Sequence, residues 1–146
     1  MPAMEPYSHL MGVNTSMLTL QEKILLEAEL FSSICKELKD VFRKQHREYF
    51  HLMNFNKEKE DLMLDEKFIQ FIVNDILSTE EYNLHGIAYY TDTFKDVVEE
   101  LAAGRNTNPS AILFRKLIVL HQSVRRALYD HILKKIILQY SNLSEK

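Results

Sequence analysis

Apolar residues recur at alternating steps of four and three along residues 19–53. The repeat begins at Thr19-Leu20-Gln21-Glu22, which has the Thr-x-x-Glu spacing of a helical capping box, and it continues over about four heptads. Its positions are Ile24, Ala28, Phe31, Cys35, Leu38, Phe42, Gln45, Tyr49 and Leu52. The pattern predicts one long amphipathic helix.

This predicted helix has two interpretations. A heptad seam can pair with a second copy of the chain, or it can cover the rest of the same chain. A helix over residues 19–53 would be about 50 Å long, which is more than a domain of this size needs. The length favours a homodimer, and the predicted interface residues are Ile24, Phe31, Cys35, Leu38, Phe42 and Tyr49.

Polar and apolar segments divide the rest of the chain. Residues 1–18 show no period and contain two prolines, so they predict a disordered arm. The charged stretch NFNKEKED, residues 54–61, predicts a linker, and residues 66–77 are apolar on most sides, as in a core helix. Residues 62–146 are then the second domain.

Capping residues mark the helices of that domain. Asn83 is placed to cap a short helix over residues 84–90, and Thr93 to cap one over residues 94–103 that Gly104 ends. Ser110, directly after Pro109, is placed to start a helical region that reaches residue 140, with a bend near residues 122–123.

Composition agrees with helices throughout. The 146 residues include only three glycines and three prolines, with 46% hydrophobic and 27% charged residues, which favours an all-α fold over an all-β one. The chain has no long uncharged apolar stretch and no basic-then-apolar leader pattern at its start. We therefore expect a cytoplasmic protein with no membrane partner.

Residues 84–104, LHGIAYYTDTFKDVVEELAAG, have the packing pattern of two short helices about a tight turn. Ala88 is small where the helices would cross, and Val98 follows ten residues later as an apolar contact. With the closing Gly104 and the Pro109-Ser110 helix start, residues 66–121 resemble the phage-repressor-like, or Xre-type, helix-turn-helix family. The resemblance implies a helix-turn-helix bundle in an oligomeric transcriptional regulator that binds double-stranded DNA.

In that family the second helix of the pair enters the major groove while the first crosses the DNA backbone. The resemblance implies groove-facing side chains at Thr93, Phe94 and Lys95, with Arg105 and Asn106 near phosphates. Asp92 stands where the family has a turn glycine, and aspartate tolerates the left-handed conformation that such a turn needs.

The charge distribution leaves two functions open. Residues 1–104 carry a net charge of −9 and residues 105–146 a net charge of +6. The basic part adds candidate phosphate contacts at Arg115, Arg125 and Arg126, although such residues also suit the solvent-facing side of a helix. The groove-facing helix is itself acidic. The alternative is therefore a protein-interaction module that binds a basic partner through Asp96, Glu99 and Glu100.

Residues that carry catalysis or bind metals do not form a recognisable pattern. None of the six histidines lies three or four residues from another, and the single cysteine excludes a cysteine-based zinc cluster. There is no glycine-rich phosphate loop and no nucleophile elbow. The sequence therefore predicts no metal, no cofactor and no enzymatic activity.

Overall fold

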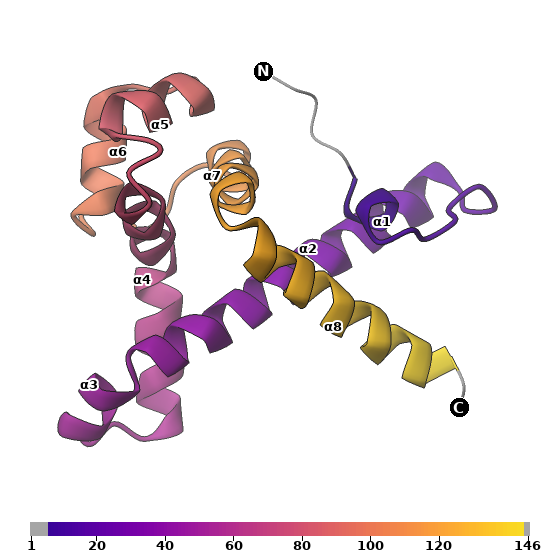
Figure 1. Cartoon of the computed structure of the whole chain (residues 1–146), viewed down its shortest axis with the longest axis horizontal. Helices are drawn as coiled ribbons and strands as arrows, with labels where there is room; N and C mark the ends of the chain where they lie inside the picture. The colour runs from indigo at the N-terminus through magenta and orange to yellow at the C-terminus, as the bar shows by residue number, and fades with distance from the viewer. Residues whose placement is uncertain (1–5, 145–146) are drawn as a thin grey trace. The chain divides into compact units, whose positions relative to one another are not determined.

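The computed structural model describes residues 6–144, and side chains up to residue 140. Over this range the chain forms eight helices and no strand, which confirms the all-α fold class (Figure 1). It divides into two compact units, residues 1–40 with 127–146 and residues 41–126. Helix α2 (Leu20–Gln45) begins in the first unit and ends in the second.

The N-terminal segment contains a docked helix, α1 (Tyr7–Leu10). The carboxylate of Glu27 on α2 accepts hydrogen bonds from the amides of Tyr7 (2.8 Å) and Ser8 (3.0 Å) and from the Ser8 hydroxyl (2.6 Å). The Tyr7 side chain is buried, with its ring centroid 6.1 Å from that of Phe31. The predicted disordered arm is therefore wrong at α1, and its first part, residues 1–5, lies outside the described residues.

The start of α2 and helix α8 (Arg126–Ser144) complete the first unit. The predicted capping box is confirmed, because Thr19 and Glu22 exchange two hydrogen bonds of 3.1 Å. Helix α8 crosses α2 in Figure 1, and Lys135 Nζ lies 2.8 Å from Glu37 Oε2. Buried residues of this unit include Leu30, Ile34, Leu38, Tyr129, Ile132 and Ile136.

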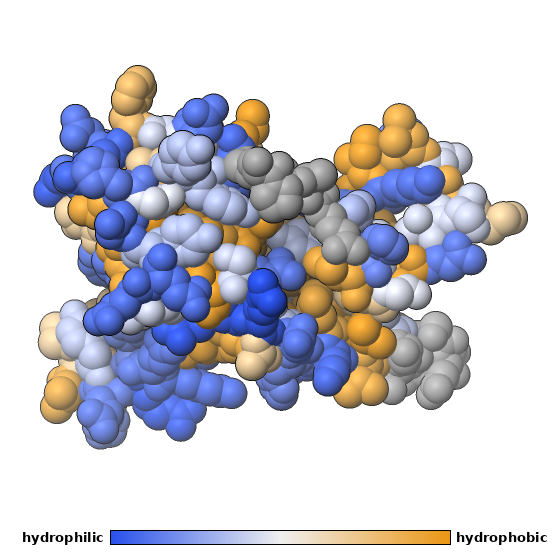
Figure 2. All heavy atoms as spheres, turned by 45° about the horizontal axis from the view of Figure 1, so that its top comes forward, coloured by the Kyte–Doolittle hydropathy of each residue, from blue (hydrophilic) through white to orange (hydrophobic). Residues whose placement is uncertain are grey.

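One side of the first turns of α2 remains apolar and exposed. Leu20 and Ile24 are 76% and 60% exposed and lie about one turn apart on α2, and Met17, in the turn just before the helix, is 92% exposed. Figure 2 shows hydrophobic residues gathered at the end of the molecule that carries α1 and the start of α2. We call these three residues the N-terminal stripe.

The long helix predicted over residues 19–53 breaks at His46. Helix α2 ends at Gln45, and α3 (Arg47–Leu52) follows after His46, whose φ is −105° and ψ is 16°. The Nδ1 atom of His46 lies 2.9 Å from the carbonyl oxygen of Phe42, and its ring stacks on Phe71 with 4.5 Å between centroids. These contacts hold the chain at the break, which the heptad pattern alone did not indicate.

The predicted linker over residues 54–61 is also wrong in extent. Helix α4 (Lys57–Ser78) starts inside it, and the Asn56 side chain caps the helix by accepting from the Lys59 amide at 2.9 Å. Two charged residues of the predicted linker form ion pairs with α2 instead. Arg43 of α2 binds Glu60 at 3.1 Å and also binds Asp61. A charged sequence is compatible with the solvated side of a helix.

Helices α5 (Leu84–Thr91), α6 (Lys95–Ala102) and α7 (Ala111–Val124) pack with α4 in the second unit. Both α4 and α5 contact α6 and α7. The caps predicted at Asn83 and Ser110 are confirmed, because Asn83 accepts from the Gly86 amide at 2.8 Å and Ser110 from the Leu113 amide at 3.1 Å. The predicted bend lies slightly later, at Arg125, where α7 ends and α8 begins.

Candidate nucleic-acid interface

The turn between α5 and α6 is closed by a left-handed residue. Asp92 has φ 55° and ψ 48°, the conformation predicted for it in place of glycine. The Asp92 amide donates to the Tyr89 carbonyl (3.3 Å) and the Thr93 amide to the Ala88 carbonyl (3.0 Å). These bonds satisfy carbonyl groups that the end of a helix otherwise leaves unpaired. The predicted tight turn is confirmed.

Small and aliphatic residues hold the two helices together. Ala88 on α5 and Val98 on α6 are both buried, as predicted, and the two helices contact each other. At the far end of α6, side-chain amides of Gln70 and Asn74 on α4 donate to the Ala102 carbonyl at 3.3 and 3.0 Å. Helix α6 is thus fixed at both ends, and its outward side chains have a defined direction.

Helix α6 begins one residue later than predicted. Thr93 does not cap it, because the Thr93 amide closes the end of α5; Phe94 is the N-cap residue, with no side-chain capping bond. The Phe94 carbonyl accepts from the Val97 and Val98 amides at 3.1 and 3.4 Å. The backbone of Phe94 is therefore part of the first helical turn, while its ring is 82% exposed.

The outward side of α6 carries more negative than positive charge. Lys95 Nζ lies 3.5 Å from Glu99 Oε1, one turn along the helix, while Asp96 and Glu100 are exposed. An exposed pair of this kind contributes little to stability, and Lys95 can exchange Glu99 for another anion. The three carboxylates of the alternative prediction do share this helix.

An open cleft lies where α5 and α6 begin. It has a volume of about 610 Å³ and is lined by Leu77, Glu80, Tyr82, Asn83, Leu84, His85 and Lys95. The first residues of α5 and the first residue of α6 therefore border one surface. Helix N-termini favour anions, because their free amide groups and the helix dipole are both positive there.

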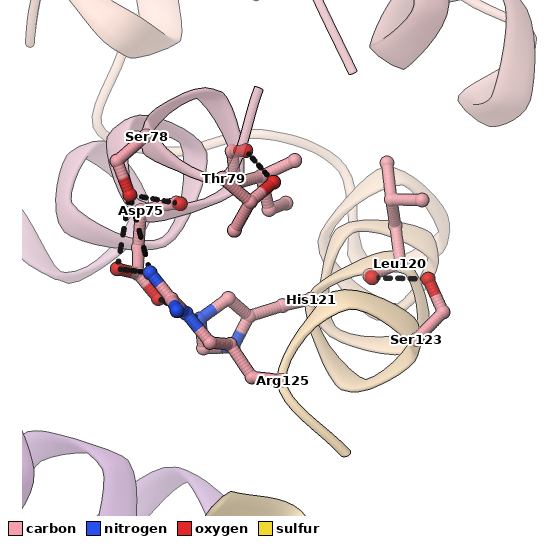
Figure 3. A network of polar contacts seen from close by, with 8 residues as sticks. Asp75, Ser78, Thr79, Leu120, His121, Ser123 and Arg125 are labelled. Carbon is pink, nitrogen blue, oxygen red and sulfur yellow. Dashed lines mark hydrogen bonds and ion pairs between the residues drawn. The ribbon is translucent and has the colours of Figure 1, made fainter. Parts of the chain in front are cut away.

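Arg125, one of the predicted DNA contacts, binds other side chains of the same chain. Figure 3 shows the Arg125 side chain directed at Asp75 of α4: Nε lies 3.0 Å from Oδ2, and Nη2 lies 3.0 Å from Oδ1 and 3.2 Å from the Ser78 hydroxyl. The fully buried His121 donates from Nε2 to the same carboxylate at 2.6 Å. We correct the prediction for Arg125, which joins α4 to the end of α7.

Electrostatics reinforce this network of Asp75, His121 and Arg125. The hydrogen bond from His121, aided by that from Arg125, holds the pKa of Asp75 well below its ordinary value, although partial burial acts in the opposite direction. The hydrogen bond to Asp75 raises the pKa of the Arg125 guanidinium in turn. The carboxylate of Asp75 and the guanidinium of Arg125 are therefore both charged at neutral pH. Sequence reasoning missed it because its members are 46 and 50 residues apart.

The other predicted basic contacts are distributed differently. Arg105 and Arg126 are exposed, and Arg115 is half-buried on α7. Asn106 accepts from the Asn108 amide at 3.1 Å and so shapes the loop after α6. Lys116, the neighbour of Arg115, donates to the Thr91 carbonyl at 3.4 Å and ties α7 to the end of α5.

The predicted dimer seam divides into buried and accessible parts. Cys35, Leu38 and Phe42 are buried within the single chain, so they offer no surface to a second copy. Burial also raises the pKa of the Cys35 thiol to about 12, which makes the thiolate scarce. Ile24 and Tyr49 are exposed and Phe31 is half-buried. Only the accessible residues remain candidates for an interface.

No helix among the described residues is both long and apolar enough to cross a membrane. In the same part of the chain, no cluster of three or more histidine, cysteine or acidic side chains is arranged to hold a metal ion. No family model, curated protein or solved structure matches this sequence or its fold.

Proposed function

We propose that this protein is a DNA-binding transcriptional regulator that places α6 in the major groove while α5 crosses the DNA backbone. The observation that carries the proposal is the shared surface at the starts of α5 and α6, held by the left-handed turn at Asp92. A helix-turn-helix protein contacts base edges with the first residues of its second helix. Here those residues are Phe94 and Lys95, with Thr93 half-buried beside them.

Phosphate contacts in this proposal come from the edges of the helix pair. Asn83, Leu84 and His85 at the start of α5 line the cleft, and the exposed Arg105 follows the end of α6. Asn106, Arg115 and Arg126 remain further candidates, whereas Arg125 is removed from the set. The protein would act by occupying DNA in the cytoplasm, without catalysis and without a cofactor.

We propose further that the regulator is a homodimer paired through the N-terminal stripe. Ile24 is the first position of the predicted heptad seam and Met17 lies seven residues before it; both side chains, and that of Leu20 at the start of α2, are exposed to water. A second copy would present an identical stripe, so that each chain covers the apolar surface of the other. Dimeric helix-turn-helix proteins bind two half-sites, one with each subunit.

Salt-dependent binding tests the DNA proposal. Anisotropy of a labelled pool of random-sequence duplexes should show an affinity that falls between about 50 and about 200 mM salt, by about 0.9 log units per log unit of salt for each neutralised phosphate. Arg105→Gln should lower that slope by about 0.9, the value for one neutralised phosphate. Lys36→Gln, which removes the same charge from an exposed position on α2, should leave the slope unchanged. Absence of salt-sensitive binding would reject the proposal.

The acidic side of α6 favours a second candidate, a protein-interaction module. Asp96, Glu99 and Glu100 leave no net positive charge on the helix that would enter the groove. A basic protein partner would be attracted by the same carboxylates, and the exposed rings of Tyr89 and Phe94 would add apolar contact area. Capture of such a partner by wild-type protein, together with no DNA binding, would favour this candidate.

A further inference from the structure

Phe94 is an exposed aromatic ring at a fixed position on the proposed DNA-facing surface. Its ring is 82% exposed, yet its carbonyl accepts from the Val97 and Val98 amides and its place follows directly from the turn at Asp92. The buried Val98 anchors the same helical turn. The backbone of Phe94 is therefore fixed at the start of α6, where a groove-binding helix contacts bases, and its side chain is exposed there.

The other side chains on α6 offer few ways to recognise a base. Guanine and adenine are commonly recognised by arginine, asparagine or glutamine, and α6 (Lys95–Ala102) contains none of these. Its one cation, Lys95, is paired with Glu99 at 3.5 Å. Its carboxylates can only accept hydrogen bonds, and they repel the phosphates on both sides of a groove. Apolar contact is thus the main means of recognition left to the start of this helix.

We propose that Phe94 recognises the C5-methyl group of thymine in the major groove. The methyl group is the apolar feature that distinguishes thymine among the base edges there, and phenylalanine is suited to contact it. The inference rests on the proposed DNA-binding function and adds a base preference to it. The protein therefore favours duplexes that present a thymine, or another pyrimidine with a 5-methyl group, to Phe94.

Duplexes that differ only in this methyl group test the inference. Full-length protein is titrated by anisotropy, at low salt, with alternating dA·dT and alternating dA·dU duplexes. Wild type should bind the dA·dT duplex roughly fourfold more tightly, which is the effect of burying one methyl group, about 0.8 kcal/mol. Alternating dG·dC with and without 5-methylation of cytosine should give a difference in the same direction, because the methyl group occupies the same position.

Two variants distinguish a methyl-group contact made by Phe94 from nonspecific apolar contact by any exposed ring. Phe94→Ala should bind dA·dT and dA·dU equally, whereas Tyr89→Ala, which removes another ring that is 90% exposed, should keep the preference. Neither ring is buried, so both variants should fold; unchanged circular dichroism checks this. Equal binding of both duplexes by wild type, or a preference that survives Phe94→Ala, would overturn the inference while leaving DNA binding intact. Binding to no duplex at all would instead reject the proposed function and the inference with it.

Discussion

Asp75 shows how much one carboxylate can organise in this protein. It accepts from the buried His121 and from Arg125, and it thereby joins the last turns of α4 to the end of α7. A charged group with such partners contributes to stability, whereas removing it leaves the buried imidazole without its acceptor. Asp75 therefore ties α4, which contacts α6, to the end of α7, which contacts α5.

At the scale of this residue, Asp75→Asn should lower the free energy of unfolding by about 2 kcal/mol at neutral pH. The folded-state pKa of Asp75 lies below its unfolded value, so its contribution is present above about pH 4 and is lost as the pH falls further. Urea unfolding should therefore show that the free energy of unfolding falls less between neutral and acidic pH for Asp75→Asn than for wild type.

Asp130→Asn, at an exposed position on α8, serves as the control and should resemble wild type at every pH. Equal stability of Asp75→Asn and wild type at neutral pH would contradict the structural role of the network. Such a result would also return Arg125 to the candidates for phosphate contact.

At the scale of the elements, local patterns explain four of the helix ends. Caps at Thr19, Asn83 and Ser110 were predictable, because a capping side chain lies within three residues of the amide that it satisfies. The left-handed turn at Asp92 was predictable for the same local reason. The break at His46 was not, since it involves a ring contact with a residue on α4.

The candidate site was predictable only in part. The buried Ala88 and Val98 follow from residue size and spacing, and so does the position of the helix pair. The pairing of Arg125 with Asp75 and the exposure of Phe94 depend on packing between segments far apart in the chain. The basic residues can be named from the sequence, but the partner that packing gives to each of them cannot.

Helix α1 gives the clearest prediction at this scale. Glu27→Ala removes the carboxylate that accepts three hydrogen bonds from Tyr7 and Ser8, so α1 should detach while α2 stays helical. Hydrogen exchange should then increase at residues 7–10 and little elsewhere. Glu29→Ala, an exposed change on the same helix, is the matched control. Unchanged protection of residues 7–10 in Glu27→Ala would show that other contacts hold α1.

At the scale of the whole molecule, the N-terminal stripe predicts self-association. Leu20→Glu/Ile24→Glu places charges in the proposed dimer interface and should shift the protein to monomer in analytical ultracentrifugation at tens of micromolar. Lys36→Glu also adds negative charge to an exposed position on α2 and should leave the dimer intact. A wild-type protein that sediments as a monomer under these conditions would exclude the proposed dimer.

A change in the charge of α6 tests whether the helix pair binds DNA. Removing two carboxylates with Glu99→Gln/Glu100→Gln should strengthen binding to random-sequence duplexes, or leave it unchanged, because negative charge leaves the surface that faces the phosphates. The measurement is duplex affinity by anisotropy for wild type and the double variant at equal salt. Weaker DNA binding by the double variant, or no salt-sensitive binding by wild type, would contradict the proposal that the helix pair binds DNA.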